Sequence, residues 1–230
     1  MLYIPRVLKD TIVSRLSQDD RIVLLFGARQ VGKTTLAKDV MNHLAGNSYL
    51  LISGEDPRAV EIISSCELSR LRGVFAGYTY VVVDEAQYIP NVGRALKLIH
   101  DNRDSLDTSV RFVITGSSSV SLAGGTREAL TGRTWSYTLY PISFKELLQI
   151  ENVFEVEARL KEALVLGMYP SLFSLPNRQD KVQHLRELSN AYLYRDVLEL
   201  GGIKNHRKLR DLLRLLAYQV GSEVSYQELG

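Results

Sequence analysis

Several features that would assign this chain to a secreted, metal-clustering or membrane protein are missing. Cys66 is the only cysteine among 230 residues, which excludes an intrachain disulfide and a cluster of thiolate ligands. The four histidines are scattered along the chain without the spacing of metal ligands. No apolar run approaches the roughly 18 residues of a membrane helix, and the opening stretch MLYIPRVLKD lacks the apolar core of a signal peptide. We therefore expect a cytoplasmic protein.

An excess of charge of one sign is also missing. The 28 Lys and Arg residues nearly balance the 26 Asp and Glu residues, so the formal net charge is +2. The chain as a whole therefore offers no electrostatic attraction to nucleic acid. What it does have is a 45% share of hydrophobic residues, enough for a sizeable core, and a length that suits one larger domain with a smaller appendage.

Apolar strand patterns alternate with helix patterns in the first part of the chain. The predicted strands lie in the stretches RIVLLF, SYLLIS, YTYVVVDEAQ, VRFVITGSSS and RTWSYTLY. The predicted helices cover 6–16, 33–44, the stretch EDPRAVEII with Asp56 as its N-cap, and the stretch NVGRALKLIHDN. This alternation indicates an α/β fold, in which helices cover both faces of a parallel sheet.

After Pro141 the strand patterns stop and helix patterns dominate. The predicted helices cover 144–150, 154–166, 178–200 and 206–219, and the stretch MYPSLFSLPN is predicted to be a loop. An all-helical segment therefore follows the α/β domain, with a soft boundary between Ile150 and Asn177.

The stretch GARQVGKTTL follows directly on the first apolar strand and fits the pattern G-x-x-x-x-G-K-[ST]. Its glycines let the backbone wrap so that N–H groups point inward, and the helix that starts near Lys33 adds the partial positive charge of its N-terminus. In such a loop the lysine reaches the β- and γ-phosphates, and the hydroxyl of Thr34 ligates Mg²⁺. We predict that a nucleotide contacts the whole loop: Gly27, Ala28, Arg29, Gln30, Val31, Gly32, Lys33, Thr34 and Thr35.

Two carboxylates end the third predicted strand. Asp84 and Glu85 follow an apolar run, so they are expected at the carboxyl edge of the sheet, where ligands bind in open α/β folds. We predict that Asp84 holds Mg²⁺ through water and that Glu85 orients and polarises the attacking water. Phosphoryl transfer needs this kind of positioning and charge neutralisation more than it needs covalent chemistry.

Further candidate residues follow the fourth strand and precede the fifth. A hydroxyl at a strand tip can sense the γ-phosphate, and we predict Ser117 first and Thr115 second for this role; a serine-rich turn that caps the next helix is the alternative. Arg133 could supply positive charge to the transition state, from its own subunit or a neighbour's, and the alternative is a surface arginine.

With these residues together, the chain resembles a family of prokaryotic AAA-type P-loop ATPases. In that family the P-loop domain is followed by a helical segment, a winged helix and a nuclease-like C-terminal domain. The matching stretches are YIPR, GARQVGKTTL, VVVDEAQ, ITGSSS, LTGRT, LYPISFKEL, GMYPSL, YLYRDVLEL and LLRLLAYQVGSEVSYQELG. The resemblance implies ATP with Mg²⁺ and a five-stranded sheet of order 5-1-4-3-2, but no particular substrate. The nuclease-like domain is not represented in these residues.

The resemblance also implies a domain layout: an AAA-type P-loop ATPase domain over 1–150, a helical domain over 151–220, and the start of a winged helix over 221–230. Ser225 and Glu228 form an S-x-x-E capping box, which predicts the first turn of a new helix. We therefore expect the 230 residues to be a fragment of a longer chain, truncated within the winged helix.

The predicted helix over 206–219 is amphipathic. Its apolar face consists of Leu209, Leu212, Leu213 and Leu216, and its opposite face carries Arg207, Arg210 and Arg214. A basic stripe of this kind can lie along the backbone of duplex DNA, although a solvated helix face is the simpler interpretation.

Two functions fit these patterns. The first is an ATPase whose cycle moves the helical and winged-helix module, with DNA as a candidate target of that module. The second is a nucleotide-dependent switch that binds DNA or a partner with little turnover. Glu85 favours hydrolysis, because a protein that only binds the nucleotide needs no carboxylate to polarise water. A small-molecule kinase needs an arginine-rich lid, and a GTPase needs an N-K-x-D motif that recognises guanine. The sequence has neither.

Overall fold

The computed structural model describes residues 3–45, 48–103, 110–117, 130–190 and 206–223, together with Ser225 and Gln227. The chain divides into two compact units, Met1–Val182 and Gln183–Gly230. The first unit therefore extends beyond the α/β part into the helical segment that follows it.

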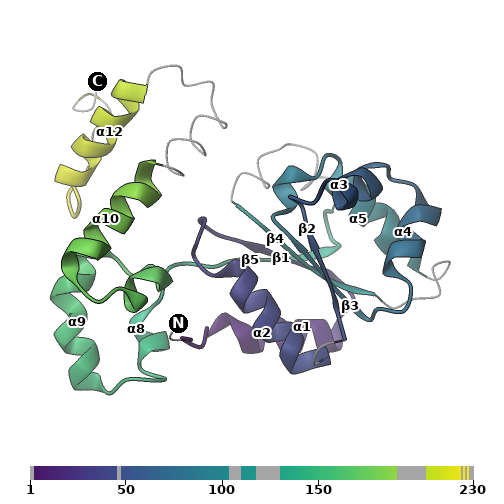
Figure 1. Ribbon diagram of the computed structural model, residues 1–230, viewed down its shortest axis with the longest axis horizontal. Helices are drawn as coiled ribbons and strands as arrows, with labels where there is room; N and C mark the ends of the chain where they lie inside the picture. Colours follow the sequence, from purple (N-terminus) through teal and green to yellow (C-terminus); the bar gives the residue numbers. More distant parts are fainter. Residues whose placement is uncertain are drawn as a thin grey trace. The chain divides into compact units, whose positions relative to one another are not determined.

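A five-stranded parallel sheet forms the centre of the first unit (Figure 1). The strand order is β2-β3-β4-β1-β5, and every neighbouring pair is parallel. This is the predicted order read from the other edge, so the predicted P-loop NTPase fold is confirmed. The strands are β1 (Ile22–Phe26), β2 (Leu50–Ser53), β3 (Tyr80–Asp84), β4 (Arg111–Gly116) and β5 (Thr134–Thr138).

Helices cover both faces of this sheet, as the alternating sequence pattern predicts (Figure 1). Successive residues of β1 serve the two faces in turn: Ile22 and Leu24 belong to one apolar cluster, Val23 and Leu25 to the other. The second cluster contains α1 (Leu8–Gln18) and α2 (Lys33–Ala45); the first contains α3 (Pro57–Ser64), α4 (Leu68–Phe75) and α5 (Val92–Asp101).

One helix of the α/β part was not predicted. The α4 helix follows Cys66, which has a positive φ of 52°, and it contains Gly73. Glycine and a nearby turn weaken a helix pattern, yet Leu71 and Phe75 are buried four residues apart, as on one face of a helix. That spacing was the available signal.

The helical segment begins with α8 (Phe144–Leu147), α9 (Val153–Leu166), the 3₁₀ turn η3 (Pro170–Ser174) and α10 (Arg178–Leu188). The helix predicted over 144–150 is therefore shorter in the structure, and MYPSLFSLPN forms a 3₁₀ turn in place of a plain loop. The later part of the helix predicted over 178–200 lies outside the described residues. In the second unit, α12 spans His206–Tyr218, close to its predicted bounds.

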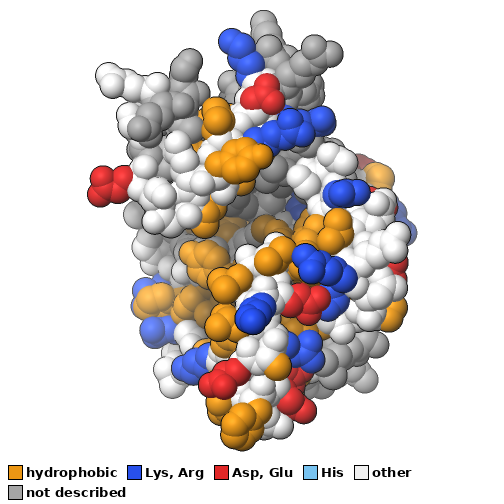
Figure 2. Space-filling view, turned by 90° about the vertical axis from the view of Figure 1, so that its left-hand side faces the viewer, with side chains coloured by type: hydrophobic (Ala, Val, Ile, Leu, Met, Phe, Trp, Pro, Cys, Tyr) orange, Lys and Arg blue, Asp and Glu red, His pale blue; other side chains and the backbone are white. Residues whose placement is uncertain are grey.

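The solvent face of α9 carries several apolar side chains, among them Phe154, which is 83% exposed. Charged residues interrupt this face at Glu157 and Lys161, both of which are exposed. Figure 2 likewise shows hydrophobic side chains scattered among charged ones on the side of the molecule that it presents. We therefore regard the α9 surface as a mixed one.

A buried ion pair fastens the N-terminal segment to α8 and to the phosphate loop. Arg6 donates from Nε to Glu146 Oε1 at 3.0 Å and from Nη1 to the carbonyl of Val31 at 2.9 Å, and it also bonds the carbonyl of Tyr140. The Arg6 and Glu146 side chains are 6% and 7% exposed. Glu146 Oε2 accepts the Ser143 N–H at 2.8 Å, which completes a capping box at the start of α8. The two residues therefore link three segments that are remote in sequence.

This pair predicts a loss of stability in acid. Burial alone would raise the pKa of Glu146, but hydrogen bonds from Ser143, Arg6 and Val7 outweigh it and the pKa lies below its ordinary value. The stabilisation is therefore complete above the pKa of an unfolded glutamate, about 4.3, and is lost as the pH falls through the lower, folded value. We expect Glu146→Gln to lower the free energy of unfolding by about 3–5 kcal/mol at neutral pH, since Arg6 then keeps an uncompensated buried charge.

Urea unfolding of both proteins, at neutral pH and in acid, measures this difference, which should shrink in acid. The matched control is Glu155→Gln, because Glu155 forms the same kind of capping box at the start of α9 but is exposed. The control should cost less than about 1 kcal/mol. A pH-independent difference, or equal losses in the two variants, would contradict the assignment.

Candidate nucleotide site

The phosphate loop begins where β1 ends, and two of its residues must be glycine. Gly27 has a φ of +154°, and a Cβ there would lie 2.4 Å from the carbonyl oxygen of Leu139. Gly32 has a φ of +99°, which side chains rarely adopt. The chain then enters α2 at Lys33, so the loop wraps around the N-terminus of a helix of 13 residues. Backbone N–H groups and the helix dipole at such a place attract an anion.

Lys33 lies inside the loop that it follows. The residue is 3% exposed, and its Nζ donates to the carbonyls of Gly27 and Ala28, both at 3.1 Å. A buried ammonium group is costly unless it is paired or hydrogen-bonded. The loop carbonyls meet that need here and hold the positive charge at the centre of the loop.

Thr34 and Asp84 meet at the carboxyl edge of the sheet. The Thr34 hydroxyl lies 3.0 Å from Asp84 Oδ1 and 2.8 Å from Oδ2, although the two residues are 50 positions apart. A hydroxyl and a carboxylate are oxygen donors of the kind that Mg²⁺ takes alongside substrate phosphates. No group of three or more His, Cys, Asp and Glu side chains suited to a metal occurs in the described part of the chain. The donor set therefore fits an ion shared with a phosphate better than a closed protein site.

Glu85 stands in a tight turn directly after β3. Its φ is 52°, and its N–H donates to the Thr115 hydroxyl at 3.1 Å. Gly54, after β2, lies so close that a Cβ there would be 2.4 Å from the Glu85 carbonyl oxygen, and its N–H donates to the Asp84 carbonyl at 2.8 Å. This turn leads into the 3₁₀ helix η1 (Ala86–Tyr88). Neighbouring strands thus hold the two carboxylates in place.

Both predicted sensor residues lie beside this acidic pair. Thr115, which is 1% exposed, donates its hydroxyl to Asp84 Oδ1. Ser117 is 3% exposed, and its backbone N–H donates to Gln87 Oε1 at 3.3 Å. Thr115, the second choice, therefore contacts an acidic residue directly through its side chain. Gln87 was not predicted at all, although it stands within the quoted stretch DEAQ.

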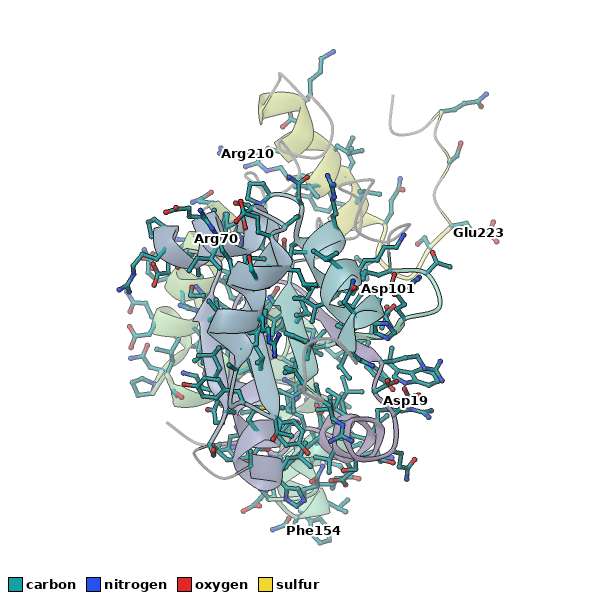
Figure 3. The ribbon with its side chains drawn as sticks, turned by 90° about the vertical axis from the view of Figure 1, so that its right-hand side faces the viewer. Asp19, Arg70, Asp101, Phe154, Arg210 and Glu223 are labelled. Atoms are coloured by element: carbon teal, nitrogen blue, oxygen red, sulfur yellow. The ribbon has the colours of Figure 1, made fainter. Side chains whose placement is uncertain are left out.

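Arg133 does not join this site in its own chain. It precedes β5, and its carbonyl accepts the N–H of Ile22 at the beginning of β1, so it lies at the amino edge of the sheet, opposite the phosphate loop. Its guanidinium binds Asp101 at 2.6 and 3.1 Å, and this hydrogen bond lowers the pKa of Asp101. Asp101, the last residue of α5, is labelled in Figure 3. Within one chain, the Arg133 guanidinium therefore bonds Asp101 and, from Nη1, the carbonyl of Thr131 at 3.2 Å.

A cavity of about 240 Å³ adjoins the phosphate loop. Its size is somewhat below the roughly 300–1,000 Å³ of pockets that hold whole drug-sized ligands. The stretches YIPR and GMYPSL contribute to this cavity, a role that the sequence alone did not predict for them. The lining residues are Tyr3, Ile4, Arg6, Gly32, Thr35, Leu36, Ile142 and Pro170.

The comparison with known families agrees with this geometry. The model of a family described as AAA domain matches residues 19–148, which include the phosphate loop, both carboxylates and all five strands. The chain belongs to the AAA domain family. A domain of unknown function matches residues 157–230, which follow this AAA domain.

Curated relatives of this AAA protein carry no functional description. An uncharacterized protein of Methanocaldococcus jannaschii is 25% identical over 224 residues, which cover 91% of this chain and 49% of the relative. An uncharacterized protein of Mycobacterium tuberculosis is 28% identical over 215 residues, 90% of this chain and 43% of the relative. The chain thus spans about half the length of these relatives.

Solved structures with a similar fold include two DNA-bound proteins. The replication initiator DnaA bound to AMPPCP and single-stranded DNA has a TM-score of 0.46 and 14% identity, over 96% of this chain and 73% of that one. The Aeropyrum pernix ORC1 protein in complex with DNA has a TM-score of 0.47 and 16% identity, over 70% of this chain and 50% of that one.

The predicted basic helix lies in the second unit. Arg210 and Arg214 are exposed on α12, and Leu212 and Leu216 are each 37% exposed. The side chains of Arg207 and Leu209 are outside the described residues, as is Glu228 of the predicted capping box. Ser225 Oγ accepts the N–H of Gln227 at 3.2 Å. No helix in the described part of the chain is long and apolar enough to span a membrane.

Proposed function

We propose that this AAA domain binds ATP with Mg²⁺ and hydrolyses it, and that the cycle moves the C-terminal helical segment. The observation that carries the proposal is the convergence of Lys33, Thr34, Asp84 and Glu85 at one edge of the sheet, from two segments 50 residues apart. Phosphate, metal and water each have a partner in this group. The family membership supports the same chemistry.

The residues have separate tasks in this proposal. The loop N–H groups and the Lys33 ammonium group bind the phosphates, and Thr34 and Asp84 hold Mg²⁺, Asp84 through water. The ion, when bound, neutralises charge that develops on the phosphate oxygens. Glu85 orients and polarises the water that attacks the γ-phosphorus.

The cavity beside the loop supports the proposal that the ligand is a purine nucleotide such as ATP. Ile4, Leu36 and Ile142 give it apolar walls, and Gly32 and Thr35 connect it to the phosphate loop. An aromatic base gains free energy from apolar burial, and the loop end of the cavity leaves the phosphates on the charged side. We therefore assign the base to this cavity.

The test is phosphate release by the purified chain from ATP, with Mg²⁺ and with excess chelator. Phosphate release that requires Mg²⁺ supports the proposal. Tight ATP binding without any phosphate release in the presence of Mg²⁺ contradicts hydrolysis. The same assay with duplex DNA examines the second candidate, a nucleotide-dependent DNA switch with little turnover. The exposed Arg210 and Arg214 favour that candidate, since arginines can bind phosphates along a duplex. DNA affinity that depends on nucleotide, without turnover, would select it.

Asp84→Asn is expected to raise the Mg²⁺ concentration for half-maximal turnover by about tenfold or more. A hydrogen bond to a charged group contributes about 1.5–3 kcal/mol, and 1.4 kcal/mol corresponds to a factor of ten. A Mg²⁺ titration at saturating ATP measures the effect. Asp101→Asn is the matched control, because Asp101 pairs with Arg133 at the other edge of the sheet. Equal Mg²⁺ dependence in the Asp84 variant and wild type would remove Asp84 from the metal site.

A further inference from the structure

Gln87 forms a bridge between the two halves of the candidate site. Its amide nitrogen donates to Glu85 Oε2, and its amide oxygen accepts the backbone N–H of Ser117 at 3.3 Å. A carboxylate only accepts hydrogen bonds and a backbone N–H only donates them, so a single orientation of the amide satisfies both partners. The bridge therefore requires a side chain that carries a donor and an acceptor at its tip.

The local backbone explains why residue 87 reaches Glu85. Glu85 has a left-handed φ of 52°, and the turn of η1 that follows is closed by the Tyr88 N–H, which donates to the Glu85 carbonyl at 3.1 Å. Ala86 is buried between them, whereas Glu85 and Gln87 are both half-buried. An asparagine would be one methylene shorter, and a glutamate would set a second carboxylate against the first.

Both carboxylates of the acidic pair are thus tied to the end of β4. Asp84 is held by the Thr115 hydroxyl, which also accepts the Glu85 N–H, and the Glu85 side chain is held through Gln87 to Ser117. Thr115 lies in β4 and Ser117 follows its last residue, Gly116. A shift at this strand end would therefore move the acidic pair with it.

We propose that Gln87 is a positioning residue for Glu85: it holds the carboxylate at the end of β4, in the place from which it acts on water. This inference rests on the proposed ATPase function and adds a residue to it. In the described part of the chain, the hydrogen bonds of the Gln87 side chain go to Glu85 and to the Ser117 backbone, and none goes to the phosphate loop, Thr34 or Asp84. Loss of Gln87 should therefore lower kcat and leave ATP binding nearly unchanged.

The experiment measures kcat, KM and equilibrium ATP affinity for Gln87→Met and Gln87→Glu. Methionine keeps the length but neither hydrogen bond, and glutamate keeps the acceptor but repels Glu85. We expect kcat to fall roughly 10- to 100-fold, as for a misplaced catalytic group, and more for glutamate than for methionine. KM and ATP affinity should stay within about threefold of wild type. Gln149→Met, the same change at an exposed position after α8, is the matched control and should match wild type.

A double-mutant cycle with Glu85→Gln separates positioning from a general structural role. If Gln87 acts through Glu85, Gln87→Met should have no further effect on the residual kcat of Glu85→Gln. An equal fold-loss in both backgrounds would overturn the inference, as would a wild-type kcat in both Gln87 variants. As long as the wild-type protein hydrolyses ATP, either of these two results leaves the proposed ATPase function intact. A wild-type protein that binds ATP without turnover would overturn both the ATPase function and the role of Gln87.

Discussion

Glu85→Gln is expected to bind ATP with Mg²⁺ about as well as wild type and to hydrolyse it at least about 100-fold more slowly. The substitution preserves the shape of the side chain and removes the charge that polarises water. Asp84, Thr34 and the loop remain as they are, so the groups that hold the nucleotide are retained. Phosphate release at saturating ATP gives the rate, and equilibrium dialysis gives the affinity.

The matched control for this prediction is Glu61→Gln. Glu61 lies on α3, its side chain is 77% exposed, and it has no part in the acidic pair. The Glu61→Gln variant should therefore hydrolyse ATP at the wild-type rate. A rate for Glu85→Gln within about threefold of wild type would move the catalytic role to another residue. A parallel loss of rate and ATP affinity would instead indicate that Glu85 serves binding more than chemistry.

The parts of the site that the sequence predicted are local ones. Gly27, Gly32 and Lys33 act within one turn, where residue type and spacing determine the backbone and the charge. Asp84 and Glu85 were predictable because an apolar strand of a parallel sheet must end at the carboxyl edge. The strand order itself came from the family resemblance, since the pattern of strands and helices leaves the order of neighbours open.

The parts that the sequence did not predict are contacts between remote segments. Arg6 and Glu146 are 140 positions apart, and each alone would be read as a surface charge. Arg133, in the stretch LTGRT, was a candidate for supplying charge to the transition state. In the structure it precedes β5 at the amino edge of the sheet and pairs with Asp101, the last residue of α5. Gln87 received no role from the sequence, because only the position of β4 in the fold supplies its second partner, the Ser117 N–H.

Lys33→Ala is expected to weaken ATP binding by about 100-fold or more while the fold is retained. Lys33 donates two hydrogen bonds to loop carbonyls in the structure, and its ammonium group lies where the β- and γ-phosphates would be bound. Each hydrogen bond to a charged group contributes about 1.5–3 kcal/mol, so the loss of two such bonds to phosphate corresponds to two or more factors of ten in affinity. Equilibrium dialysis with ATP and Mg²⁺ measures the change.

The control is Lys38→Ala, which removes an exposed lysine from the same helix. It should leave ATP affinity unchanged, although it removes the same formal charge. Lys33 is buried, so its truncation also removes a hydrogen bond to the Gly27 carbonyl. Lys33→Met serves as a second variant, because methionine keeps most of the aliphatic part of the side chain and removes the ammonium group. Circular dichroism and the melting temperature establish whether each variant is folded. A folded Lys33 variant of either kind with wild-type affinity would mean that the nucleotide does not occupy this loop, because the ammonium group lies inside it, on the carbonyls of Gly27 and Ala28.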